Sequence, residues 1–149
     1  MASKRMFSLN IVDSDAFLDM PVSSQLLYFH LGMRADDDGF IGNAKKIAKI
    51  CNCSVDDLSV LIGKGFLIPF NDGVVVIKHW RMNNNKPDLA HYKPTTYQED
   101  YQSLYLKENK SYTINPNEGT ALNGSVKLFA DVNGVVNEAC IAENRKKFD

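Results

Sequence analysis

The strongest constraint on the fold is a change in hydrophobic spacing close to residue 66. Before it, apolar residues recur at the i, i+3, i+4 spacing of an amphipathic helix: Leu58, Leu61 and Ile62. Ser54 would cap this helix, and Asp57, three residues later, can complete a capping box. After it, FLIPFNDGVVVIKHW contains two β-rich runs on either side of Asn71-Asp72-Gly73, a composition typical of hairpin turns. The sequence therefore predicts a helix followed by an antiparallel hairpin, in which Pro69 marks an edge strand because it cannot donate to a ladder.

A second short helix, NAKKIAKIC, precedes this one, and Asn43 is a suitable residue for its N-cap. The two helices meet at a turn with the spacing of a helix-turn-helix. That unit needs a small residue in its first helix, a left-handed residue in the turn and an apolar anchor in the second helix. Ala48, Asn52 and Leu58 occupy these three positions, and Asn tolerates positive φ better than most residues other than Gly.

Upstream, SSQLLYFHLGMRA predicts a mostly apolar helix capped by Ser23 or Ser24, and Phe40-Ile41 predicts a small strand. The expected order is helix, small strand, helix-turn-helix and β-hairpin wing. This is the order of a winged helix-turn-helix, an α+β fold.

Three consecutive aspartates, Asp36, Asp37 and Asp38, precede Gly39. A calcium loop would need a glutamate near its twelfth position, which is Ile47 here. A catalytic carboxylate pair would need a partner that the sequence does not identify. We therefore expect the aspartates to solvate a helix end and Gly39 to let the chain reverse.

Candidate metal and catalytic residues are few. A zinc ion would find only three ligands here, namely Cys51, Cys53 and His79. One residue separates the two cysteines in the sequence, whereas structural zinc sites usually have two to four residues between them. With no phosphate-binding glycine loop and no nucleophile–base motif, we predict neither an enzyme nor a cofactor. The odd number of cysteines does not suit a disulfide framework, and the sequence shows neither a signal peptide nor an apolar run of 18 residues. We therefore predict a cytoplasmic protein outside the membrane.

Charge is concentrated in the middle of the chain. The whole chain carries −1, whereas residues 43–93 contain 8 basic and 4 acidic side chains. An anionic partner would be sought there, and lysines bind phosphates without distinguishing base sequence. The candidate DNA-binding residues are Lys45, Lys46, Lys49, Ser59, Lys64, Lys78 and Arg81. Four to six phosphate contacts would give a log–log salt slope of about −4 to −5.

Wider stretches of the sequence resemble a known family. Three stretches closely resemble the N-terminal region of phage and prophage replisome organiser proteins, which are relatives of the primosomal protein DnaD. These stretches are RMFSLNIVDSDAFLDMPVSSQLLYFHLGMRADDDGFIGNAKKIAKI, GFLIPFNDGVVVIKHWRMNN and YKPTTYQED. The resemblance covers about residues 4–106 and implies a winged-helix domain in replication initiation. Such a domain would bind duplex or single-stranded origin DNA, self-associate and recruit helicase-loading proteins in the bacterial host cytoplasm.

The alternative is a protein-interaction module with little direct DNA binding, because Asp56 and Asp57, expected to be exposed near the start of the second helix, would repel phosphates. The candidate subunit interface for such a module consists of Phe7, Phe17, Phe40, Phe66, Ile68 and Phe70. We divide the chain into a winged-helix domain at residues 1–106 and a C-terminal extension at residues 107–149. This extension is expected to be partly disordered, or to form a hairpin at Asn133-Gly134 and a small helix.

Overall fold

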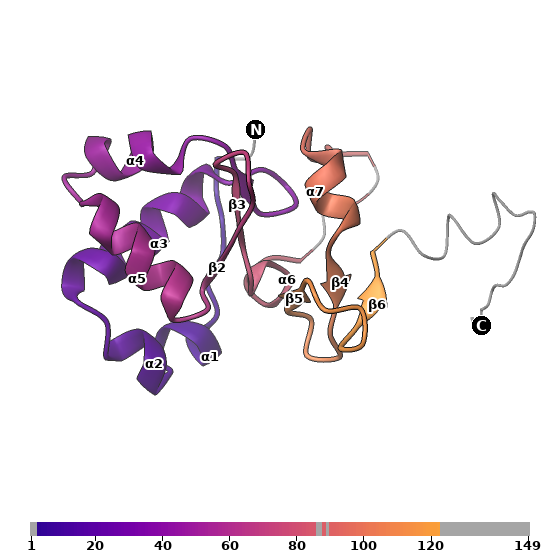
Figure 1. Ribbon diagram of the computed structural model, residues 1–149, viewed down its shortest axis with the longest axis horizontal. Helices are drawn as coiled ribbons and strands as arrows, with labels where there is room; N and C mark the ends of the chain where they lie inside the picture. The colour runs from indigo at the N-terminus through magenta and orange to yellow at the C-terminus, as the bar shows by residue number, and fades with distance from the viewer. Residues whose placement is uncertain (1–2, 86–87, 89, 123–149) are drawn as a thin grey trace, which may run out of the picture. The chain divides into compact units, whose positions relative to one another are not determined.

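The computed structural model describes residues 3–85, 88 and 90–122. It is a mixed α+β structure with small antiparallel sheets (Figure 1). The described residues form two compact units: the first contains those up to Tyr97 together with Asn109–Tyr112, and the second contains Gln98–Glu108 and residues 113–122. The domain boundary expected after residue 106 falls inside the second unit. The hairpin expected at residues 133–134 lies outside the described residues.

The first unit contains most of the helices. Its elements are α1 (Leu9–Val12), α2 (Asp15–Leu18), α3 (Val22–Arg34), β1 (Phe40–Ile41), α4 (Ala44–Ile50), α5 (Val55–Gly63), β2 (Leu67–Pro69), β3 (Val75–Ile77) and α6 (Trp80–Asn83). The second unit contains α7 (Gln98–Gln102), β4 (Tyr105–Leu106) and β6 (Thr120–Ala121), and β5 (Tyr112–Thr113) crosses the division between the units. β4 and β6 pair antiparallel. No helix of the described residues has the length and apolar character needed to cross a membrane.

The turn between α4 and α5 has the geometry expected from its sequence. Asn52 adopts a φ of 60°, and the N–H of Cys53 donates to the carbonyl of Ala48 at 2.8 Å. Ala48 is 1% exposed, so its small side chain allows close packing at this crossing. Ser54 and Asp57 form the expected capping box at the start of α5.

The start of α3 differs from the expectation. Its N-cap is Pro21, and neither Ser23 nor Ser24 caps it. Both serine hydroxyls instead donate to the Asp57 carboxylate at 2.8 Å. They therefore join the first turn of α3 to α5, a contact between residues more than thirty positions apart.

The first sheet has the strand order β1-β3-β2. β3 pairs antiparallel with both neighbours, with Phe40 opposite Val76 and Pro69 opposite Val75. Gly73 has a φ of 82° in the turn between β2 and β3. The hairpin and the edge position of Pro69 are thus confirmed.

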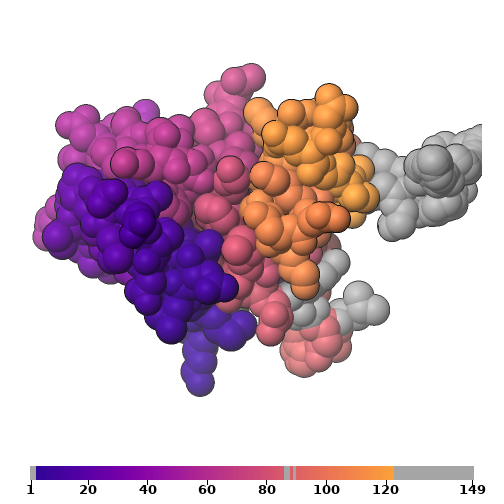
Figure 2. Space-filling view, turned by 90° about the horizontal axis from the view of Figure 1, so that it is seen from below, coloured from indigo at the N-terminus to yellow at the C-terminus, as the bar shows by residue number. Residues whose placement is uncertain are grey.

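Aromatic rings fill the core between α2, α3 and β2. Phe17, Tyr28 and Phe66 are at most 3% exposed and pack edge to face, with centroids 5.2–5.8 Å apart. In the space-filling view, the indigo N-terminal residues lie directly against the magenta middle of the chain (Figure 2). The core thus joins the N-terminal helices to the segment that contains α5 and the β2–β3 hairpin.

Candidate nucleic-acid interface and an adjoining pocket

Helix α4 has one buried side and one basic side. Ala44, Ile47 and Ala48 are at most 4% exposed. Lys45, Lys46 and Lys49 are exposed, and none of them forms an ion pair within the described residues. We call these three lysines the lysine face. Its exposure follows from the sequence pattern that predicted the helix.

Helix α5 is less acidic on its surface than expected. Asp57, expected to be exposed, is only 6% exposed. Burial raises its pKa, but hydrogen bonds from the Ser54 backbone and from the hydroxyls of Ser23, Ser24 and Ser54 outweigh burial and lower the pKa below the ordinary 3.8. Asp56 therefore remains as the exposed carboxylate of the helix, beside the exposed Ser59.

The other predicted DNA contacts differ in their surroundings. Lys64 is exposed just after α5, and Lys78 is half-buried just after β3. Arg81 requires a correction, because its guanidinium donates to Asp38 at 3.3 Å and to the Tyr112 hydroxyl at 3.2 Å. With 14% of its side chain exposed, Arg81 stabilises the interior of the unit instead of offering a free cation to phosphate.

Asp38 is the hub of a buried polar network. Its side chain is fully buried, and its carboxylate accepts hydrogen bonds from the Tyr92 hydroxyl at 2.7 and 2.8 Å and from the Thr95 N–H at 2.9 Å. Its backbone carbonyl accepts a hydrogen bond from the Tyr112 hydroxyl at 2.8 Å. Asp38 thus holds two distant segments of the chain, so the expectation that it solvates a helix end is wrong.

The other two aspartates are also structural. Asp36 accepts hydrogen bonds from the N–H groups of Asp38 and Phe40, which close a turn around Gly39. Burial raises the pKa of Asp36 above the usual value, against the hydrogen bonds that it accepts. Gly39 has a φ of 91°, so the chain reversal that its sequence predicts is confirmed.

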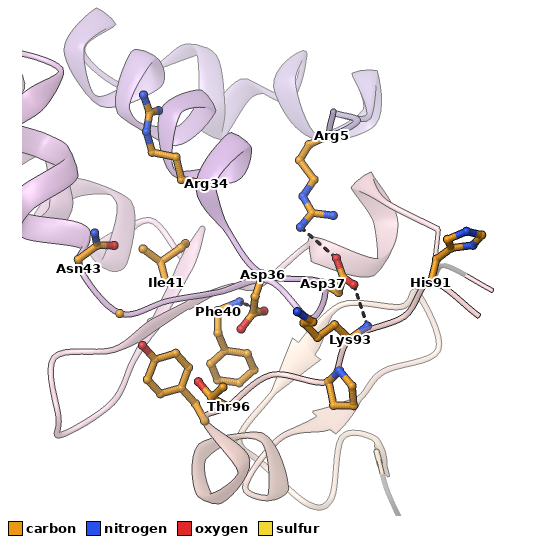
Figure 3. Close-up of a pocket in the computed structure, with 13 residues that line it drawn as sticks. Arg5, Arg34, Asp36, Asp37, Phe40, Ile41, Asn43, His91, Lys93 and Thr96 are labelled. Atoms are coloured by element: carbon orange, nitrogen blue, oxygen red, sulfur yellow. Dashed lines mark hydrogen bonds and ion pairs between the residues drawn. The ribbon is translucent and has the colours of Figure 1, made fainter. Parts of the chain in front are cut away.

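Asp37 joins the N-terminal segment to the segment after α6. It accepts a hydrogen bond from the Arg5 guanidinium at 3.2 Å and another from the Lys93 N–H at 2.9 Å (Figure 3). The Arg5 guanidinium also lies over the Trp80 ring, 5.1 Å from its centroid. The sequence singled out neither Arg5 nor Lys93 as a functional residue, since both depend on contacts distant in the chain.

These segments surround a pocket of about 580 Å³. Figure 3 shows side chains reaching it from the end of α3, from the aspartate turn, from the start of α4 and from the segment after α6. The lining residues are Arg5, Arg34, Asp36, Asp37, Phe40, Ile41, Gly42, Asn43, His91, Lys93, Pro94, Thr96 and Tyr97. The lining combines aromatic rings, an amide and charges of both signs.

Three residues of the predicted subunit interface are corrected by their burial. Phe17, Phe40 and Phe66 are 1–3% exposed, so their rings pack in the core of the unit and offer no surface to another chain. Phe7, Ile68 and Phe70 are half-buried, and their role at an interface stays a prediction.

The cysteines of the turn do not form a metal cluster in the structure. Cys51 and Cys53 are free thiols of intermediate burial, and no group of three or more potential metal ligands occurs in the described part of the chain. The thiol of Cys53 lies 3.5 Å from the carbonyl of Ser23, so it packs where α3 meets the turn.

Comparisons with known proteins give no relative: no protein-family model, no curated protein and no solved structure matches this chain.

Proposed function

We propose that this chain is a winged helix-turn-helix module that binds DNA and self-associates in phage or prophage replication initiation. The observation that carries the proposal is the lysine face of α4, formed by Lys45, Lys46 and Lys49. Duplex DNA presents one phosphate charge per about 1.7 Å of its axis, so a compact cation cluster can neutralise several phosphates. The resemblance to replisome organiser proteins supplies the biological setting and the expected helicase-loading partners.

The winged-helix assignment is supported by the element order. α3, β1, α4, α5, β2 and β3 follow one another in the expected sequence, and the sheet has the order β1-β3-β2. The left-handed Asn52 between α4 and α5 supports a helix-turn-helix at this position.

The proposed contact is mainly with the DNA backbone. Lysines at phosphates supply affinity and position but no base recognition. On α5, Ser59 is exposed but Asp56 would face phosphates unfavourably. The module should therefore bind many sequences with similar affinity, and we assign it no catalytic role.

Fluorescence anisotropy of labelled duplex and single-stranded DNA at several salt concentrations tests the proposal. We expect a steep salt dependence that Lys45→Glu and Lys46→Glu flatten. Lys4→Glu is the matched control, because it reverses the same charge at an exposed lysine outside α4. Duplex affinity that is equal in the α4 variants and the wild type would refute the lysine face as the site.

The second candidate function is protein interaction without DNA binding. It is favoured by large apolar side chains that are 44–81% exposed on or beside the helices: Leu9, Leu18, Val22, Leu26, Ile50 and Val55. Light scattering of the free protein separates the two functions. A stable oligomer that binds no DNA at low salt would favour this candidate.

A further inference from the structure

The pocket beside α4 contains aromatic and polar groups suited to a nucleotide. Its volume of about 580 Å³ lies within the range of small-ligand sites. Phe70, Phe40 and Tyr97 form a stack, with neighbouring centroids 5.8 and 6.1 Å apart and interplanar angles of 22° and 25°. Tyr97 is the half-exposed outer ring of the stack where it lines the pocket. A planar base can extend such a stack, because every base has a π-face.

Some polar atoms of the lining make no hydrogen bond or ion pair within the described residues. Asn43 holds the N-cap position of α4, but its side chain makes no capping hydrogen bond. Arg5 is 6% exposed, and its Nε–H has no partner within the described residues. The Lys93 side chain is exposed and forms no ion pair in the part of the chain that the structure describes. The pocket thus offers the Asn43 amide and the Lys93 ammonium beside its aromatic wall.

The charge of the lining favours an anion that also carries polar acceptors. Asp36 and Asp37 are balanced by Arg5 and Lys93, and Arg34 adds a further cation. Asp37 is already held by Arg5 and by the Lys93 backbone. A nucleotide fits this set, since its phosphate needs cations and its base edge can pair with an amide.

We propose that this pocket binds one unpaired nucleotide of a DNA strand, with the base stacked on Tyr97 and hydrogen-bonded by Asn43. Lys93 holds its phosphate. The inference rests on the proposed DNA-binding function and deepens it: Asn43 precedes Lys45 by two residues, so a strand that crosses the lysine face passes close to the pocket. The module would therefore prefer DNA with a single-stranded end or a melted stretch over intact duplex.

The test uses a 3′-fluorescein-labelled oligodeoxyadenylate of four nucleotides, titrated with the full chain at low salt. Asn43→Ala removes no capping hydrogen bond, so it should keep the wild-type unfolding midpoint while lowering oligonucleotide affinity about tenfold. Tyr97→Leu should lower the affinity by at least that factor, because it removes a stacking platform. Gly42→Ala should weaken binding without altering charge, since an added Cβ would collide with the Tyr97 hydroxyl.

The outcomes separate this inference from the proposed function. The inference is overturned if wild-type protein does not bind the oligonucleotide, or if Asn43→Ala and Tyr97→Leu both bind it within twofold of wild type. It is also overturned if only Lys45→Glu and Lys46→Glu abolish binding, because the lysine face alone would then be the site. The duplex titration with the two lysine variants decides the proposed function independently.

Discussion

Replacing the carboxylate of Asp38 with an amide tests the buried network at the centre of the first unit. Asp38→Asn conserves the shape of a fully buried side chain but removes the charge that faces the Arg81 guanidinium at 3.3 Å. The Tyr92 hydroxyl and the Thr95 N–H both donate to this side chain. The amide that replaces the carboxylate has N–H donors of its own, so donors would face donors at this position. Some of these donors must then lose their acceptor.

Breaking a buried ion pair by removing one partner typically costs about 3–5 kcal/mol. Arg81 keeps 14% of its side chain exposed, so water compensates part of its charge, and we expect a loss of about 3 kcal/mol in the free energy of unfolding. That is a large part of the total of about 5–15 kcal/mol typical of a domain. Urea unfolding monitored by the fluorescence of Trp80, the single tryptophan, measures the loss.

A double-mutant cycle identifies the source of the loss. Arg81→Met removes the cation whose charge Asp38 balances, so Asp38→Asn should cost about 1–2 kcal/mol less in the Arg81→Met background than in the wild type. A loss below about 1 kcal/mol for Asp38→Asn alone, or an equal loss in both backgrounds, would refute the argument that this ion pair stabilises the unit.

Three further substitutions test other contacts. Gly39→Ala must keep a φ of +91° and would place its Cβ 2.6 Å from the Trp80 ring, so the free energy of unfolding in urea should fall by about 2–4 kcal/mol. Burial raises the pKa of Tyr28 from 10.0 to about 12. The stability that Tyr28 contributes is thus complete below pH 10 and falls by up to about 3 kcal/mol as the pH rises to 12, a decline that Tyr28→Phe should remove from the pH dependence of unfolding. Hydrogen bonds keep the pKa of Asp57 below 3.8 despite its burial, so the contribution of Asp57 is present above pH 3.8 and is lost as the pH falls through the lowered pKa. The deficit of Asp57→Asn in unfolding free energy should therefore be about 1–3 kcal/mol at pH 7 and disappear in acid.

The features that the sequence predicted correctly are local. The left-handed Asn52, the capping box of Ser54 and Asp57, and the hairpin turn at Gly73 each depend on residues within a few positions of one another. Local backbone chemistry decides them, because the competing interactions come from the same short segment.

The features that the sequence missed depend on distant partners. Tyr92 and Thr95 lie 54 and 57 positions after Asp38, so nothing near the aspartate run indicates that one carboxylate will be buried. Ser23 is separated from Asp57 by 34 positions. A serine before an apolar run predicts an N-cap, but Ser23 and Ser24 lie inside the first turn of α3, where their hydroxyls donate to Asp57.

The burial of Asp57 and Arg81 changes the electrostatic argument for DNA binding. Helix α4 exposes Lys45, Lys46 and Lys49, and Lys64 follows α5, whereas Asp56 is the exposed carboxylate of α5. Charges further apart than about 10 Å are largely screened at 0.1 M salt, so a DNA strand at this surface responds to the local excess of cations and not to the net charge of −1. With Arg81 held inside the unit, three or four lysines remain as the proposed phosphate contacts, and the expected log–log salt slope becomes about −3 to −4. A measured slope of −6 or steeper would require cations beyond this surface and would refute its assignment as the whole binding site.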